Sequence, residues 1–208
     1  MKAPAFASSE PAEIWLDVGA HLGEKTLPAA RSNPALRVYA FEPNLRLAMR
    51  LVGLAPNFVV LPMAVAEQTG TADFHLNSFE AASSLLPFDP TGLQRWIGGD
   101  VLRVVETVPV PVIRLDTFME LAGIGRVDYL KIDAQGGDLE VVRSAGDRIR
   151  SIGRISLEVQ ITPFPLYAGG AKKEDVLEYL LRSGFRLEEV EQQSHVQEEN
   201  LTFSRVVP

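Results

Sequence analysis

Acidic residues and glycines recur at a fixed spacing near the start of the chain, where the segment WLDVGAHLGEKT occupies residues 15–26. Asp17, Gly19 and Gly23 match the pattern D-x-G-x-x-x-G, and Glu42 follows the next apolar run in the motif FEP. Glycine after a buried strand lets a ligand approach the backbone at the start of a helix. A carboxylate at the end of the neighbouring strand can accept hydrogen bonds from ribose hydroxyls. The combination predicts a binding site for a nucleoside-like ligand.

Two phosphate-binding patterns match this segment less well. The dinucleotide pattern G-x-G-x-x-G, begun at Gly19, lacks its second and third glycines. The phosphate-loop pattern G-x-x-x-x-G-K-[ST] matches Gly19, Lys25 and Thr26, but Glu24 stands where a glycine is required and would repel phosphate. A phosphate-loop NTPase that uses Lys25, Thr26 and Asp133 is therefore the alternative. The acids favour a nucleoside with a cationic sulfonium, an amino-acid group and no phosphate.

Two further acids follow apolar runs, Asp133 after YLKI and Glu158 after ISL. If these runs are neighbouring strands, both carboxylates open onto the same crevice as the glycine loop. Either could bind an acceptor or take the proton of a reacting hydroxyl, with Asp133 the first candidate and Glu158 the second. His21 in the glycine loop is an alternative base, because its pKa range suits the role. The three histidines of the chain show no metal-ligand spacing, so we expect no metal site.

These residues need an α/β framework to bring them together. Apolar runs alternate with helix-length segments, which predicts βαβ units and a mostly parallel sheet. Strands are expected at residues 14–18, 37–41, 58–65, 110–115, 127–132 and 155–159, followed by an antiparallel hairpin of residues 186–190 and 201–206 with a polar connection at 191–200. Helices are expected at residues 19–31, after the cap Asn44, and at 117–122, 138–145 and 174–182. In the second helix Leu45, Met49 and Val52 fall on one face.

The middle of the chain is less regular. Residues 66–109 contain glycine, serine and proline punctuation and a short helical run near residues 93–97. We interpret this segment as an excursion that shapes an acceptor site, within a single domain of residues 1–208.

Composition limits the classes of partner. The chain has 208 residues, 46% of them apolar, and a formal net charge of −7, so it has a core but no cationic field for nucleic acid or an anionic membrane. It contains no cysteine, which excludes disulfides, thiolate zinc sites and cysteine nucleophiles. The first residues form no apolar leader segment, so a cytoplasmic location is the expectation. The oligomeric state is left open.

The ordered motifs LDVGAHLG, VYAFEPN, ASSLL, RLDTF, DYLKIDAQGGDLEVVRSAG and ISLEVQ resemble those of the FkbM-type methyltransferases, over residues 14–205. These are class I enzymes that use S-adenosylmethionine and act mostly on oxygen. The resemblance implies a Rossmann-like three-layer α/β sandwich with a seven-stranded, mostly parallel sheet and an antiparallel last strand. It also implies that S-adenosylmethionine is the cofactor.

The resemblance assigns roles to the site residues. It implies that the methionine end of the donor is lined by Asp17, Gly19 and Gly23. It implies that Glu42 binds the ribose and that Ala64 and Glu67 border the adenine. The residues that it places toward the acceptor are Ser83, Ser84 and Gln135. Gln135 stands where the family commonly has a glutamate. A neutral amide neither takes a proton nor adds charge to a divalent cation, so a metal role is doubtful.

The expected reaction is transfer of a methyl group to a hydroxyl of a sugar, a glycan or a natural product. A noncatalytic module that binds S-adenosylmethionine but has lost turnover through Gln135 is the second alternative.

Overall fold

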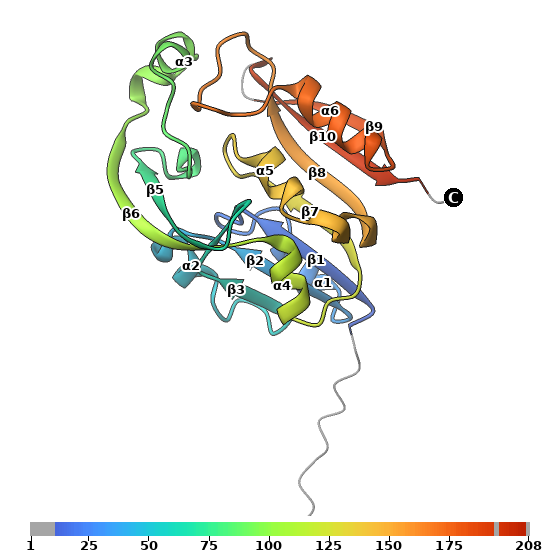
Figure 1. Ribbon diagram of the computed structural model, residues 1–208. Helices are drawn as coiled ribbons and strands as arrows, with labels where there is room; N and C mark the ends of the chain where they lie inside the picture. Colours follow the sequence, from blue (N-terminus) through green and yellow to red (C-terminus); the bar gives the residue numbers. More distant parts are fainter. Residues whose placement is uncertain (1–10, 194–195, 207–208) are drawn as a thin grey trace, which may run out of the picture.

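The computed structural model describes residues 11–193 and 196–206, and its centre is a seven-stranded sheet (Figure 1). The strand order is β3-β2-β1-β7-β8-β10-β9. The strands are β1 Glu13–Val18, β2 Leu36–Phe41, β3 Phe58–Leu61, β7 Val127–Ile132, β8 Ile152–Gln160, β9 Phe185–Gln193 and β10 Glu198–Arg205. The first five pair in parallel, whereas β10 is antiparallel to both β8 and β9. The predicted α/β fold is confirmed.

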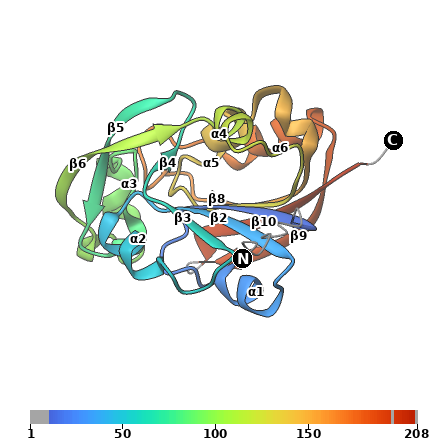
Figure 2. The same cartoon turned by 90° about the horizontal axis from the view of Figure 1, so that it is seen from below.

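Helices cover both faces of this sheet (Figure 2). They are α1 Leu27–Ser32 and α2 Leu45–Leu51 on one face, and α4 Leu115–Leu121, α5 Asp138–Arg143 and α6 Lys173–Arg182 on the other. The apolar side of each helix packs against the sheet. This packing forms the two main clusters of buried side chains. Among the described residues, no helix has the length and apolar character needed to cross a lipid bilayer.

A second, three-stranded sheet of order β4-β6-β5 carries the excursion (Figure 1). Its strands are β4 Ala64–Val65, β5 Gly70–Asn77 and β6 Val104–Ile113, and the short helix α3 Pro90–Arg95 lies between β5 and β6. The expected strand at residues 58–65 is therefore two strands in different sheets, and β6 begins earlier than the expected strand at 110–115. Pro62 stands at the break, because proline cannot donate a backbone hydrogen bond to a sheet. The assignment of residues 1–208 to one domain stays a prediction.

Two other expectations were wrong in detail. Residues 19–26 form turns and not a helix, since Gly19, His21 and Gly23 have positive φ values of 71°, 49° and 73°. The C-terminal strands β9 and β10 extend through most of the polar segment 191–200, because β10 is an inner strand whose backbone is paired on both sides. Asn44 does cap α2, accepting a hydrogen bond from the Arg46 nitrogen at 3.1 Å. Leu45, Met49 and the C-cap residue Val52 do share one face, and this face is exposed.

Candidate functional site

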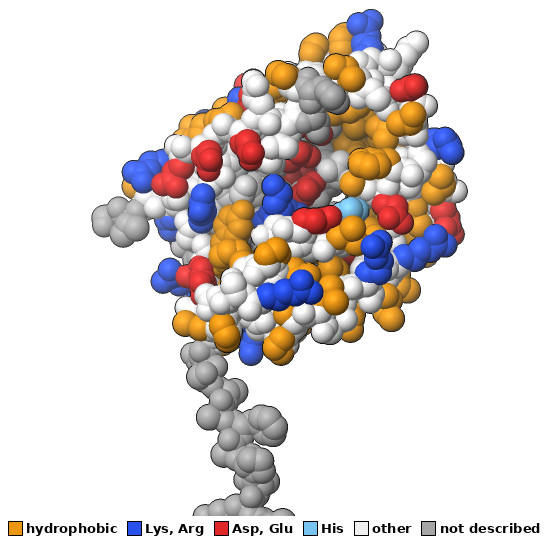
Figure 3. Space-filling view, turned by 180° about the vertical axis from the view of Figure 1, so that it is seen from behind, with side chains coloured by type: hydrophobic (Ala, Val, Ile, Leu, Met, Phe, Trp, Pro, Cys, Tyr) orange, Lys and Arg blue, Asp and Glu red, His pale blue; other side chains and the backbone are white. Residues whose placement is uncertain are grey.

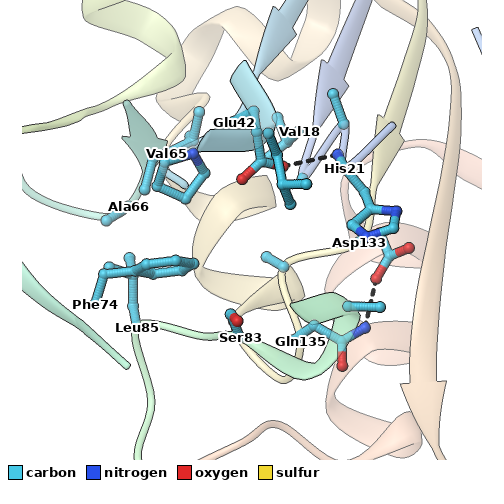
Figure 4. A pocket seen from close by; sticks show the side chains of 18 of the residues that line it. Val18, His21, Glu42, Val65, Ala66, Phe74, Ser83, Leu85, Asp133 and Gln135 are labelled. Atoms are coloured by element: carbon cyan, nitrogen blue, oxygen red, sulfur yellow. Dashed lines mark hydrogen bonds between the residues drawn. The ribbon is translucent and has the colours of Figure 1, made fainter. Parts of the chain in front are cut away.

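The carboxyl ends of the parallel strands meet at a cavity of about 560 Å³. The space-filling view shows a hollow with acidic side chains inside it and hydrophobic side chains along one border (Figure 3). Glu42 lies at one end of the cavity and Asp133 and Gln135 at the other, with Phe74 and Leu85 of the excursion facing them (Figure 4). A cavity of this size fits a nucleoside-like ligand together with part of a second molecule.

The glycine loop borders this cavity closely. The Gly19 nitrogen donates to the Phe41 carbonyl at 3.0 Å, and a Cβ at Gly19 would lie only 1.9 Å from the Asp133 carbonyl oxygen. Gly19 therefore allows the loops after β1 and β7 to touch. Gly23 lies away from the cavity, where a Cβ would meet Leu27 and Leu51. Its role is to pack the loop against the helices.

Asp17 lies behind the cavity and does not line it. The side chain is buried, its Oδ2 accepts a hydrogen bond from Thr26 Oγ1 at 2.5 Å, and its Oδ1 lies 3.1 Å from Lys131 Nζ. Lys131 Nζ also donates to the Gly19 carbonyl at 2.6 Å and lies 3.7 Å from Asp133 Oδ2. Burial lowers the Lys131 pKa, but Asp17 and Asp133 outweigh burial and raise it well above its ordinary value. Asp17 thus organises the glycine loop through Lys131 and Thr26.

Glu42 is buried at the end of β2 and points into the cavity (Figure 4). Its two carboxyl oxygens accept hydrogen bonds from the His21 nitrogen at 2.7 Å and the Asn44 nitrogen at 2.8 Å. Burial raises the pKa of Glu42 to about 7, against the opposing effect of these two bonds. The His21 nitrogen reaches Glu42 from the glycine loop, so the loop and the acid hold each other in place.

Asp133 follows β7 and lines the cavity with its side chain 41% exposed. Gln135 Nε2 donates to Asp133 Oδ1 at 2.7 Å and lies 3.4 Å from Glu158 Oε2. A cation held between Asp133 and Glu158 would face this N–H group, so the pair is poorly suited to a metal. In the part of the chain that the structure describes, no group of three or more His, Cys, Asp or Glu side chains is arranged for a metal ion.

Glu158 does not line the main cavity, contrary to the expectation that it opens onto the same crevice as Asp133. It borders a small cavity of about 20 Å³ with Asp138 and Glu198. Burial raises the pKa of Glu158 well above its usual range, and the nearby Asp133 and Glu198 raise it further. Burial, with Asp133, also raises the pKa of Asp138 to about 8. The raised pKa favours the protonated form of Glu158, and its position outside the main cavity makes it a poor base for an acceptor bound there.

These raised pKa values predict that the ligand-free protein loses stability as the pH rises from about 5 to 8. Glu42 and Asp138 keep their protons in the folded chain after they have lost them in the unfolded chain, so the free energy of unfolding falls as the pH rises. Each such proton contributes a slope of up to about 1.4 kcal/mol per pH unit. Urea denaturation across this range measures the slope.

Asp138→Asn should flatten this dependence, because Asn cannot bind the proton. Asp147→Asn is the matched control, since the Asp147 side chain is 99% exposed. Equal slopes in Asp138→Asn and in the unmodified chain would contradict the assignment.

The remaining predicted residues divide into those that line the cavity and those that do not. His21, Ala64, Glu67, Ser83 and Gln135 line it. Ser84 does not. Its buried hydroxyl donates instead to the Gln135 carbonyl at 2.8 Å.

Two functional side chains were missed by the sequence analysis. The sequence analysis gave Lys131 no role in the site, although a lysine inside the apolar run YLKI is a signal of a buried charge. Tyr167 is fully buried and reaches Gln135 Oε1 at 2.7 Å, and no pattern in the sequence marks it. The phosphate-loop alternative is not supported, because Thr26 is buried against Asp17 and cannot reach a nucleotide-bound magnesium ion.

The strand order, the glycine loop and the acid at the end of β2 together are those of the class I methyltransferase fold. The family model described as the methyltransferase FkbM domain matches residues 17–187. The chain belongs to the FkbM methyltransferase family, and the resemblance seen in the sequence is confirmed.

The proteins that this chain is similar to are consistent with the family assignment. The chain is 24% identical over 144 residues to the 2-O-methyltransferase NoeI of Sinorhizobium fredii (strain NBRC 101917 / NGR234), covering 64% of this chain and 57% of that protein. The chain thus spans little more than half the length of this relative. Among solved structures, Aeropyrum pernix fibrillarin with natively bound S-adenosyl-L-methionine has a TM-score of 0.52 and 13% identity, covering 94% of this chain and 67% of that chain. At this identity the likeness concerns the fold.

Proposed function

We propose that the protein transfers a methyl group from S-adenosylmethionine to a hydroxyl oxygen of a sugar, a glycan or a natural product. The observation that carries the proposal is the placement of Asp133, with a half-exposed carboxylate, in the same cavity as Glu42. The similarity to a 2-O-methyltransferase supports oxygen as the acceptor atom.

The residues at the β1 and β2 ends fit S-adenosylmethionine. The carboxyl oxygens of Glu42 keep lone pairs that can accept hydrogen bonds from the ribose hydroxyls. The backbone nitrogens of His21 and Asn44 already donate to Glu42, so they need no phosphate group as an acceptor. Ala64 lies on the apolar side of the cavity, where an adenine ring would pack, and Glu67 lines it nearby. Bound there, the cofactor supplies an electrophilic methyl group on a cationic sulfonium.

In the proposed mechanism Asp133 acts as the general base. The acceptor oxygen forms a bond to the methyl carbon while the bond from that carbon to sulfur breaks, and Asp133 takes the hydroxyl proton. Lys131 and Gln135 keep the carboxylate in place, at 3.7 Å and 2.7 Å from its two oxygens. Ser83, which lines the cavity from the excursion, can bind another hydroxyl of the acceptor.

The charges around the cavity favour an uncharged acceptor. Six carboxylate side chains line it: Glu24, Glu42, Glu67, Glu80, Asp133 and Glu140. The lysines that line it are Lys25 and Lys131, and Lys131 is committed to Asp17 and the Gly19 carbonyl. A phosphate or carboxylate on the acceptor would meet a surplus of negative charge.

A methyl-transfer screen with radiolabelled S-adenosylmethionine tests the proposal. The acceptors are neutral glycosides and phenols, each matched with a phosphorylated or carboxylated analogue. We expect transfer to neutral members and at least tenfold less to their anionic partners. Binding of S-adenosylhomocysteine without transfer to any acceptor would instead favour the noncatalytic module. Tight binding of ATP with magnesium and no binding of S-adenosylhomocysteine would overturn the proposal.

Glu42→Ala should weaken S-adenosylhomocysteine binding about 100-fold, because hydrogen bonds to a charged group contribute roughly 1.5–3 kcal/mol each. Calorimetry measures the affinity. Below pH 7 the wild-type affinity should also fall with decreasing pH, since the ligand then competes with the proton on Glu42. Glu42→Gln should remove that pH dependence.

The matched control is Glu80→Ala, an exposed acid that also lines the cavity. It should change the affinity less than threefold. Unaltered binding in Glu42→Ala, with its fold verified by circular dichroism, would refute the ribose role.

A further inference from the structure

The backbone of Gln135 is held in an unusual conformation. Gln135 lies between β7 and α5 with a φ of 52°, a value that residues other than glycine rarely adopt. Its carbonyl accepts a hydrogen bond from Ser84 Oγ at 2.8 Å. The next residue, Gly136, packs under Tyr167 so closely that a Cβ would lie 2.9 Å from Tyr167 Cβ. Such strain persists only where the surroundings enforce it, so the direction of the Gln135 side chain is imposed by its neighbours.

Both ends of the Gln135 amide are engaged. Nε2 donates to Asp133 Oδ1 at 2.7 Å and lies 3.4 Å from Glu158 Oε2, while Oε1 accepts a hydrogen bond from the Tyr167 hydroxyl at 2.7 Å. A primary amide donates at one end and accepts at the other, which neither a carboxylate nor an alkyl group can do. With its N–H group toward Asp133, the amide pairs with the carboxylate oxygen as an acceptor.

The direction of the Gln135 amide is linked to Asp133. The Tyr167 oxygen lies 3.0 Å from the Ala82 carbonyl and 2.7 Å from Gln135 Oε1, but its single proton can serve only one of them. If the amide turned over, Gln135 Oε1 would face Asp133 Oδ1. Two oxygens at that distance need a proton between them, so the turned amide requires a protonated carboxyl group. The direction of the amide and the ionisation of Asp133 are therefore coupled.

We propose that Gln135 is a positioning residue whose amide, held between the Tyr167 hydroxyl and Asp133, keeps the Asp133 carboxylate as its hydrogen-bond acceptor and aimed into the cavity before the acceptor molecule binds. The inference rests on the proposed function in that Asp133 is the base of that reaction. The charged or titratable groups that face this network are Lys131, Asp133, Glu158, Asp138, Glu198 and Tyr167. Four of these six groups are carboxyl groups. A neutral residue at position 135 therefore avoids adding another negative charge beside them.

The first test compares the charge of two Gln→Glu variants. Gln94→Glu lies on the exposed surface of α3 and should add close to one negative charge at pH 7, measured by capillary electrophoresis. Gln135→Glu should add less than half a charge, because its carboxyl group takes a proton in order to lie beside Asp133. A full additional charge in Gln135→Glu would overturn the inference.

The second test follows the side-chain amide of Gln135 by nitrogen-15 NMR in glutamine-labelled protein. In the wild type we expect the Nε2 resonances to shift with pH, and Asp133→Asn should abolish that shift. Tyr167→Phe should accelerate amide proton exchange at least tenfold. An amide signal that does not respond to pH, Asp133→Asn or Tyr167→Phe would show a merely structural role. Neither test contains the methyl donor or an acceptor. A failed methyl-transfer screen would therefore contradict the proposed function without changing the outcome of these two tests.

Discussion

Asp133→Asn should lower kcat for methyl transfer about 10²- to 10⁴-fold, the range that removal of a general base produces. Asparagine has nearly the same shape and still accepts a hydrogen bond from Gln135 Nε2, but it cannot take the proton of the hydroxyl. Asp133 lies at the opposite end of the cavity from Glu42, so the affinity for S-adenosylhomocysteine should stay within about threefold. The measurement is radiolabelled transfer to the best acceptor of the screen, with calorimetry for donor binding.

Two control variants distinguish Asp133 from the other candidate general bases. Glu158→Gln should change kcat little, because the Glu158 carboxyl group lies outside the main cavity and has a raised pKa. His21→Asn removes the other candidate base, whose Nδ1 lies 3.2 Å from Glu24 Oε1. If His21→Asn lost as much activity as we expect for Asp133→Asn, while Asp133→Asn remained active, the base would be His21.

Lys131→Met should destabilise the fold by about 3–5 kcal/mol, the cost of leaving a buried charge without its partner. Asp17 is 1% exposed and has Lys131 Nζ as its cationic partner at 3.1 Å. The substitution also removes the donor to the Gly19 carbonyl, which lies 2.6 Å from Nζ. Because small proteins are stable by only about 5–15 kcal/mol, the loss is a large share of the total. Urea denaturation measures it.

Lys25→Met is the matched control for Lys131→Met. Lys25 also lines the cavity but is exposed, so its loss should cost less than about 0.5 kcal/mol. Adding Asp17→Asn to Lys131→Met should restore part of the lost stability, because the unpaired charge is then gone. A loss below about 1 kcal/mol in Lys131→Met would contradict the inferred role of the buried ion pair.

The position of the site could be predicted because parallel strands end at a common edge. Val18 of β1 pairs with Phe41 of β2 and with Ile132 of β7, so the residues that follow all three strands lie together. Glu42 and Asp133 are two of these residues, and both line the cavity. The sequence pattern was enough to predict where the site lies, because that prediction needs only the order of the strands and the residues at which they end.

Which acids face the cavity could not be predicted. Asp17 and Lys131 are neighbours in the register of β1 and β7, and this pairing turns Asp17 into a structural residue. Glu158 likewise points toward Glu198 on β10 and away from the main cavity, a contact between strands that are distant in the sequence. Side-chain direction at a strand end depends on such partners, which a single sequence does not reveal.

The buried face of α2 shows another limit. The helix sequence LRLAMRL places apolar residues on more than one side, so periodicity allows two faces. The structure buries Leu47, Ala48 and Leu51, because the path from Glu42 and the cap at Asn44 sets the rotation of the helix. Tertiary contacts thus decided what the pattern left ambiguous.

The contact between Gly19 and the Asp133 carbonyl has an evolutionary consequence. A side chain at position 19 would collide with the backbone after β7, since its Cβ would lie 1.9 Å from that oxygen. A substitution at position 19 can therefore be inherited only together with a new path for the chain around Asp133. The glycine loop after β1 and the segment after β7, although far apart in the sequence, must change as a pair.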